Sequence, residues 1–160
     1  MKEIDSLVFV FIPVEASMPL TMDSCREIRR RVFIEEQAVP SEVEQDSNDA
    51  LSAHLLLTKG AHPIGTLRIR KTEEGLKLER IALLKEYRGN KLGRLLVIEG
   101  VKRARELYRK ERIYVHSQVQ ASNFYASLGF KRGDKYIEEG QRLHVVMTLS
   151  ETAEKELLLQ

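Results

Sequence analysis

Residues 86–97, with the sequence EYRGNKLGRLLV, combine cations, glycines and the start of an apolar helical pattern. Arg88, Lys91 and Arg94 surround two glycines at the point where the helix should begin. A helix dipole already makes that end positive, so cations belong there only beside an anion. Glycines also allow backbone N–H groups to converge on one anion. The stretch therefore predicts a phosphate or pyrophosphate site. A glycine turn with solvated cations is the alternative, because short glycine motifs give many false matches.

Apolar residues recur around this stretch with the periods of strands and helices. Strand-like patterns occupy residues 7–14, 53–60, 63–70, 76–84, 112–119, 135–139 and 142–149. Helical spacing occupies residues 22–37, about 92–110 and 121–129. The acidic segment 38–50 has no period and contains a proline, which predicts an exposed connection near a site.

The order of these elements predicts an α/β fold, with a mixed sheet flanked by helices. Residues 53–60 and 63–70 are expected to form an antiparallel hairpin. The strand, helix and strand of residues 76–119 are expected to form a parallel crossover. In such sheets the ligand crevice lies beyond the carboxyl end of a strand, where the chain enters a helix. EYRGNKLGRLLV occupies that position.

Length and composition restrict the class of protein. The 160 residues suit a single domain spanning 1–160. Cys25 has no intrachain partner, and no positive leader precedes an apolar run, so we expect a cytoplasmic protein. No apolar run reaches the roughly 20 residues that span a bilayer. The net charge of +2 gives no argument for nucleic acid. We therefore expect neither a membrane nor a nucleic-acid partner.

The loop resembles the pyrophosphate loop of the GNAT superfamily of acetyl-CoA-dependent N-acetyltransferases, whose pattern is Arg/Gln-x-x-Gly-x-Gly/Ala. Arg88, Lys91 and Gly93 occupy the three marked positions. Lys91 departs from the first glycine of the pattern. In this respect RGNKLGRLLV is similar to the variant in glucosamine-6-phosphate N-acetyltransferases, which also lack that glycine.

Two further motifs extend the resemblance over residues 26–149. SNFYASLGFKR, residues 122–132, resembles the second GNAT signature FY-x-x-x-GF. REIRRRVFIEEQAVPSEVEQDSNDALSAHLLL, with LKLERIALLKEYRG, resembles the bacterial branch of ElaA-like and YjcF-like proteins. Residues 150–160 lie outside this match, and we expect a short amphipathic helix or a frayed tail there.

The resemblance implies a central strand that bulges and splays from its neighbour, so that the pantetheine arm of acetyl-CoA fits the gap like an added strand. The N–H near Leu83 would polarise the thioester carbonyl. The implied cofactor-binding residues are Ile81, Ala82, Leu83, Arg88, Gly89, Asn90, Lys91, Leu92, Gly93, Arg94, Gln118, Asn123 and Tyr125. No metal ion is implied.

Tyr125 occupies the general-acid position of the family within NFYASLGF. A phenol, with an ordinary pKa near 10, can protonate a departing thiolate. The alternative for Tyr125 is an aromatic side chain that only packs the short helix against the sheet.

Three residues are candidates for the base that takes the proton of the amine. Glu79 lies just before the implied bulge, and an ion pair with Arg68 or another strand cation is its alternative. His116 lies on the next strand, and a histidine titrates near neutral pH, although a lone strand histidine is more often structural. His144 resembles a histidine near the end of the branch's sequences, with one extra residue between the glycine and the histidine.

The first helix and the following loop usually roof the acceptor pocket in this fold, so Arg31, Glu36 and Gln37 are candidate substrate-binding residues. An arginine there could bind a phosphate or carboxylate on the acceptor. A solvated face with spaced ion pairs is the alternative for these charges.

These features predict an N-acetyltransferase that moves the acetyl group of acetyl-CoA to a primary amine of a small molecule by direct attack. Acetylation of a protein N-terminus or lysine is one alternative, to which the acidic segment could contribute by attracting a cationic peptide. A non-catalytic acyl-CoA-binding regulatory module is another. Many proteins of this fold form homodimers, and the sequence does not identify an interface strand.

Overall fold

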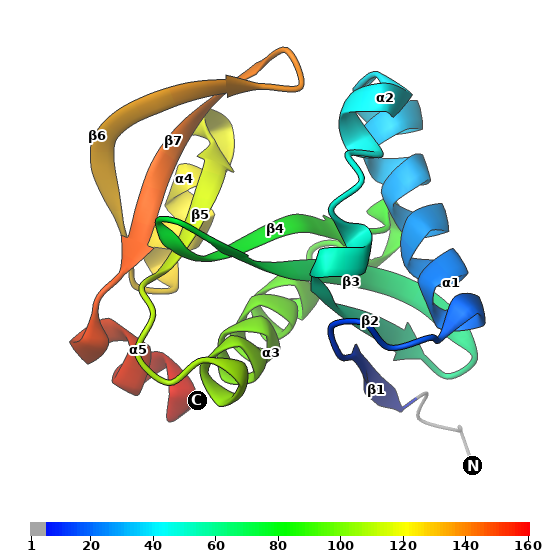
Figure 1. Cartoon of the computed structure of the whole chain (residues 1–160), viewed down its shortest axis with the longest axis horizontal. Helices are drawn as coiled ribbons and strands as arrows, with labels where there is room; N and C mark the ends of the chain where they lie inside the picture. The colour runs from blue at the N-terminus through cyan, green and yellow to red at the C-terminus, as the bar shows by residue number, and fades with distance from the viewer. Residues whose placement is uncertain (1–5) are drawn as a thin grey trace.

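The computed structural model describes residues 6–160 as seven strands with helices on both faces of one sheet (Figure 1). The strands are β1 (Leu7–Ile12), β2 (Ala53–Lys59), β3 (His62–Thr72), β4 (Gly75–Leu83), β5 (Ile113–Gln118), β6 (Phe130–Glu139) and β7 (Arg142–Leu149). The α-helices are α1 (Pro19–Arg29), α2 (Ser41–Glu44), α3 (Leu92–Leu107), α4 (Ser122–Ser127) and α5 (Glu151–Leu158). A π-helical segment, Arg30–Glu36, continues α1.

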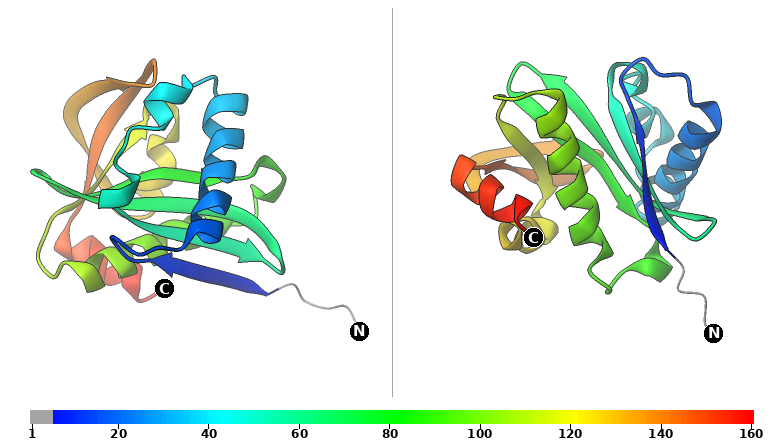
Figure 2. Two further views of the ribbon diagram at one scale, coloured as in Figure 1. Left: turned by 45° about the vertical axis from the view of Figure 1, so that its right-hand side comes forward. Right: turned by 90° about the horizontal axis from the view of Figure 1, so that it is seen from below.

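The sheet has the order β1-β2-β3-β4-β5-β7-β6, with β4 and β5 parallel and the other neighbours antiparallel. The expected hairpin is β2–β3, and the expected crossover is β4–α3–β5. Helix α1 lies on one face of the sheet, and α3 and α5 lie on the other, as Figures 1 and 2 show. The mixed sheet flanked by helices that the sequence predicts is confirmed.

Each face of the sheet has its own apolar core. Helix α1 buries Met22, Cys25 and Ile28 against Leu56 and Leu84. Helix α3 buries an apolar stripe with helical spacing on the other face, consisting of Leu92, Leu96, Val97, Val101 and Ala104. Cys25 is a buried free cysteine, which fits the small apolar residue that its spacing indicates.

Strand β4 bulges and then leaves its neighbour. Arg80 has a φ of +50°, and the β3–β4 register shifts between Thr66 and Arg68, so one extra β4 residue is inserted there. On the other side, β4 pairs with β5 only at Leu76 and Lys77. Beyond Lys77 the two strands diverge, and the sheet opens between them (Figure 1). The bulge and the splay that the resemblance implies are therefore both present.

The acidic segment differs from the exposed irregular connection that was expected. It contains α2 and a 3-10 turn at Asp49–Leu51, and Glu44 is only 4% exposed. The reason is electrostatic, because arginines from three elements hold its carboxylates against the sheet. Residues 151–158 form helix α5, whose N-terminus is capped by Ser150.

Candidate active site

A cavity of about 570 Å³ opens where β4 and β5 diverge. Its walls come from the π-helical segment and the acidic segment, from β3 and β4, from β5 with α4, and from the β6–β7 hairpin. The lining residues include Gln37, Glu79, His116, Gln118 and Tyr125. With Ile81 and His144, which also line the cavity, the structure brings together seven residues that the sequence analysis selected from positions far apart in the chain.

His116 lines this cavity with one ring nitrogen unpaired. Its Nδ1 lies 2.5 Å from Oε1 of Glu139. A carboxylate only accepts hydrogen bonds, so Nδ1 carries the hydrogen and the neutral ring keeps its lone pair on Nε2. Nε2 is buried and has no hydrogen-bond partner within residues 6–160. A buried nitrogen of this kind is suited to accept a proton from a bound substrate.

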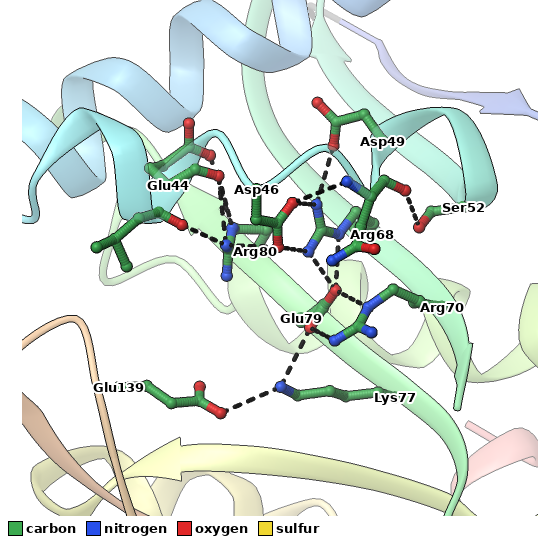
Figure 3. Close-up of polar contacts among 12 residues, drawn as sticks. Glu44, Asp46, Asp49, Ser52, Arg68, Arg70, Lys77, Glu79, Arg80 and Glu139 are labelled. Atoms are coloured by element: carbon green, nitrogen blue, oxygen red, sulfur yellow. Dashed lines mark hydrogen bonds and ion pairs between the residues drawn. The ribbon is translucent and has the colours of Figure 1, made fainter. Parts of the chain in front are cut away.

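Glu79 is buried in an ion-pair cluster (Figure 3). The Nε atoms of Arg68 and Arg70 each lie 2.7 Å from Oε2, and Nζ of Lys77 lies 3.2 Å from Oε1. Burial raises the pKa of Glu79, but the hydrogen bond from Arg70 and the charges of Arg68 and Lys77 outweigh it and hold the pKa at about 2. The ion pair that was the alternative reading of Glu79 is therefore present. A carboxylate of such low pKa is a weak base.

The same cluster anchors the acidic segment over the sheet. The guanidinium of Arg68, which is 0% exposed, donates to both carboxylate oxygens of Asp46 at 2.8 and 2.7 Å, and to Asp49 at 3.0 Å. Arg80, at the bulge of β4, donates to Asp46 at 3.0 Å and to the Val43 carbonyl at 3.1 Å (Figure 3). The roof of the cavity is thus tied to the strand that forms its floor.

Acid should remove stability that the carboxylates of Glu79 and Glu139 supply. Glu79 and Glu139 both have a pKa of about 2 in the folded protein, against an ordinary value of 4.5. A carboxyl with a lowered folded pKa stabilises the fold above its ordinary pKa, and that contribution is lost as the pH falls through the folded value. We expect the melting temperature to fall steeply between about pH 4.5 and pH 2, as measured by thermal unfolding. A melting temperature that stays level over that range would contradict the assignment.

Tyr125 lines the cavity from α4. Its ring packs edge-on against Phe124 and Phe130, with centroids 5.0 and 5.9 Å apart. Burial raises the pKa of the phenol, so Tyr125 is protonated at neutral pH. Its hydroxyl makes no hydrogen bond to any described residue of the chain. Tyr125 therefore packs the helix and also lines the cavity, while its role as an acid stays a prediction.

The turn before α3 has free backbone donors. Lys91 is its N-cap residue and has a φ of +61°, the left-handed conformation that glycine adopts most easily. The first backbone bond of the helix runs from the N–H of Leu95 to the Lys91 carbonyl, at 3.2 Å. The N–H groups of Leu92, Gly93 and Arg94 have no acceptor within residues 6–160. With the helix dipole, these donors form a site suited to an anion.

Arg88 and Glu36 contact each other, although they were expected to bind different groups. Nη1 and Nη2 of Arg88 lie 2.6 and 2.9 Å from the two carboxylate oxygens of Glu36, and Nε donates to the Leu83 carbonyl at 2.9 Å. Hydrogen bonding to Arg88 lowers the pKa of Glu36. The pair links the end of the π-helical segment to the turn before α3.

Arg31 lies away from the main cavity. It pairs with Glu86 at 2.8 Å and lines a second cavity of about 520 Å³ beside α1, together with His62 and Tyr87. Gln37 stays at the main cavity, where its Oε1 accepts a hydrogen bond from Nε2 of Gln118 at 3.0 Å.

The remaining selected residues occupy mixed environments. Ile81 lines the main cavity, Ala82 is buried, and Leu83 is half-buried. Gly89, Asn90 and Asn123 are exposed. The Nδ1 of His144 lies 2.9 Å from the Arg142 carbonyl, and His144 lines the main cavity.

Glu139 and Arg142 also line the cavity, and neither was selected as a site residue from sequence. They are partners across the β6–β7 hairpin. Glu139 follows a second glutamate, and such a pair in sequence indicates charge that faces solvent. The contact of Glu139 with His116 joins residues 23 positions apart in the chain. The alternation of β6 and β7 could have indicated which of their residues share a face, but not what that face meets.

A family model described as "Acetyltransferase (GNAT) domain" matches residues 19–151. The chain belongs to the GNAT acetyltransferase family. Among GNAT relatives, the uncharacterized protein YyaT of Bacillus subtilis is 38% identical over 127 residues, which are 76% of this chain and 84% of that protein. The uncharacterized N-acetyltransferase YjcF of Bacillus subtilis is 32% identical over 104 residues, which are 65% of this chain and 74% of that protein.

Solved structures share this GNAT fold. Escherichia coli ElaA has a TM-score of 0.81 and 23% identity, covering 89% of this chain and 99% of that one. An acyl-CoA N-acyltransferase from Pseudomonas aeruginosa has a TM-score of 0.81 and 22% identity, covering 91% of this chain and 100% of that one. The family and branch that the motifs indicate are confirmed. Within residues 6–160, no helix has the length and apolar character needed to cross a bilayer.

Proposed function

We propose that this GNAT protein transfers the acetyl group of acetyl-CoA to a primary amine of a small molecule, by direct attack in a ternary complex. The observation that carries the proposal is the position of His116, which lines the cavity where β4 leaves β5 and whose buried Nε2 has no partner among the described residues. A basic nitrogen beside an open strand edge is what deprotonation of an amine next to a thioester requires.

The donor is proposed to lie along the open edge of β4. Ile81, Ala82 and Leu83 follow the bulge, where β4 has no partner on the β5 side. After this edge the chain passes through the 3-10 turn Lys85–Tyr87 and reaches the turn before α3. The free N–H groups of the turn before α3 suit a pyrophosphate. Lys91 adds a positive side chain at the same turn. The residues present therefore fit acetyl-CoA.

His116 is proposed to accept the proton of the attacking amine on Nε2. Glu139 holds the ring in the tautomer that leaves Nε2 free and stabilises the positive charge that forms. The new C–N bond forms as the C–S bond breaks, and Tyr125 donates its phenolic hydrogen to the leaving thiolate. The N–H near Leu83 is proposed to polarise the carbonyl. Glu79 serves in this scheme by holding Arg68, Arg70 and Lys77 in place.

Replacing Tyr125 by phenylalanine should slow turnover while CoA binding is retained. The ring and its contacts with Phe124 and Phe130 remain, and only the hydroxyl is lost. We expect kcat to fall roughly 100-fold, the lower range for loss of a general acid, with an unchanged Kd for CoA by calorimetry. Phe124→Leu, a change beside the acid that leaves the hydroxyl in place, is the matched control. Normal turnover by Tyr125→Phe would remove Tyr125 from the acid role.

Release of the CoA thiol tests the proposed reaction. Purified protein with acetyl-CoA should release thiol at a rate that depends on added primary amine, and mass spectrometry should find the N-acetyl product. Amine-independent release would indicate hydrolysis, and CoA binding without release from any amine would favour the regulatory module.

The acidic segment gives little support to a peptide acceptor. Glu44, Asp46 and Asp49 are turned inward and paired with Arg29, Arg68 and Arg80, so their charge is already neutralised. A cationic peptide would have to compete with these buried arginines.

A further inference from the structure

The cavity contains one strongly basic side chain whose charge the protein itself does not neutralise. Arg70 and Lys77 pair with Glu79, and Arg80 pairs with Glu44 and Asp46. Arg142 also lines the cavity, and no carboxylate lies within ion-pair distance of it in the described part of the chain. Within residues 6–160, Arg142 is the only arginine or lysine of the cavity lining that has no carboxylate partner.

The surrounding charges are balanced without Arg142. Five buried or partly buried cations and five carboxylates form the cluster behind the cavity, and they are Arg29, Arg68, Arg70, Lys77, Arg80, Glu44, Asp46, Asp49, Glu79 and Glu139. Glu138 alternates with Glu139 along β6 and is exposed at the rim, where it pairs with no described cation. Arg142 is therefore not needed to balance this cluster, and Glu138 is the one other charged residue of the cavity lining that pairs with no described residue of opposite charge.

Hydrogen bonding leaves most of the Arg142 guanidinium available. A guanidinium has five N–H donors. In Arg142 only Nη2 donates, to the Gln37 carbonyl at 3.1 Å. That bond holds the half-buried side chain against another residue of the cavity lining. The other donors have no acceptor among the described residues, and a planar fork of donors matches a carboxylate or phosphate.

Arg142 is also placed close to the proposed base. It is the direct cross-strand partner of Glu139, and such partners point to the same face of a hairpin. Glu139 is turned to His116, which it contacts at 2.5 Å, and to Lys77, 3.3 Å away. Arg142 and His116 therefore both lie beside Glu139 at the same cavity.

Resting on the proposed acetyl transfer, we infer that the acceptor is an amine that also carries an anionic group, a carboxylate or a phosphate, and that Arg142 binds this group. Amino acids and aminoalkyl phosphates are the two sources of that chemistry. Arg142 takes the role that the sequence analysis gave to Arg31, which lies in the second cavity.

Matched acceptor pairs test this inference by thiol release. Amino acids are compared with their carboxamides, and aminoethyl phosphate with ethanolamine, so that each pair differs in the anion. The wild-type protein should have the higher kcat/KM for the anionic member of at least one pair, and the pair that shows it identifies the source. In Arg142→Gln, the KM for that member should rise roughly 10- to 100-fold, as expected for a lost charged hydrogen bond. Its kcat and the KM of the uncharged member should change little.

Controls separate this effect from a general disturbance. Arg142→Lys should recover part of the affinity for the anionic acceptor. Arg132→Gln alters an exposed arginine of the same hairpin that stacks on Tyr136, and it should leave the acceptor KM unchanged. Arg142→Gln should unfold close to the wild-type temperature, because it breaks no ion pair and removes only the hydrogen bond to the Gln37 carbonyl.

The outcomes distinguish the inference from the function on which it rests. Equal or better use of the uncharged acceptors, together with an insensitive Arg142→Gln, would overturn the anionic acceptor and leave acetyl transfer intact. Absence of thiol release with every amine would overturn both.

Discussion

Replacing His116 by glutamine should lower kcat/KM roughly 100- to 10,000-fold, the range found for loss of a general base. Nε2 of His116 is a buried ring nitrogen without a partner in the described chain, and it lies where β4 and β5 diverge. Glutamine keeps a polar group of similar length but cannot accept a proton from an ammonium ion at neutral pH. The Kd for CoA should not change. Thiol release under saturating acetyl-CoA measures kcat/KM, and calorimetry measures the Kd for CoA.

Two further variants make this result specific. In Glu139→Gln, the glutamine amide can both donate to and accept from Nδ1 of His116, so the ring tautomer is no longer fixed. We therefore expect kcat to fall less than in His116→Gln, with little effect on KM. His62→Gln, at an exposed histidine outside the main cavity, should behave as wild type. If His116→Gln keeps most of the activity, another group takes the proton, and the proposed role of His116 is wrong.

Arg68→Met should destabilise the fold by about 3–5 kcal/mol, the cost of breaking a buried ion pair by removing one partner. Methionine fills much of the space of the arginine stem, so the loss is mainly electrostatic. Asp46, Asp49 and Glu79 would lose their shared cation while remaining in a largely buried site. Chemical denaturation measures the free energy of unfolding.

The matched control is an exposed arginine with equally short contacts. Arg30 pairs with Glu27 and Glu35, but its side chain is 46% exposed. Arg30→Met should cost much less than Arg68→Met, because water screens such pairs. A similar small loss for both variants would mean that the cluster around Arg68 is effectively solvated. A large loss for Arg68→Met alone would confirm that the cluster holds the acidic segment to β4.

Much of the fold could be predicted because its elements carry clear periods. The apolar spacing of α3 and the runs of β2 and β3 depend on local residues, and their bounds differ from expectation by a few residues only. The ends of the helices and strands were predicted less accurately. Helix α3 ends at Leu107 and not near Lys110, and β6 begins at Phe130, five residues before the expected strand. Strand β6 lies at an edge of the sheet and is exposed over most of its length. Its sequence therefore lacks the apolar alternation that predicts a strand.

The site was less predictable, because its contacts join distant segments. Sequence alone left Glu79 between a base and an ion pair, and the choice depends on Arg68, Arg70 and Lys77, which only the β3–β4 register brings to one carboxylate. Arg31 was selected by its place on the first helix, yet the rotation of that helix directs it to Glu86.

Local chemistry and motif resemblance both predicted an anion site at the turn before α3, and that site stays a prediction. The left-handed φ of Lys91 could not be read from a lysine, since glycine or asparagine is the usual signal for that conformation. The motif assigned the position to glycine, and the backbone there has the geometry that glycine favours.

Calorimetric titration of the purified protein with CoA and acetyl-CoA tests the central claim most directly, namely that the splay between β4 and β5 and the turn before α3 form an acyl-CoA site. We predict saturable binding of one CoA per chain, weakened in Lys91→Glu, which places a negative charge at the proposed pyrophosphate turn. No heat of binding with either ligand, from protein whose thermal unfolding is cooperative, would contradict the account and leave EYRGNKLGRLLV as a turn with solvated charges.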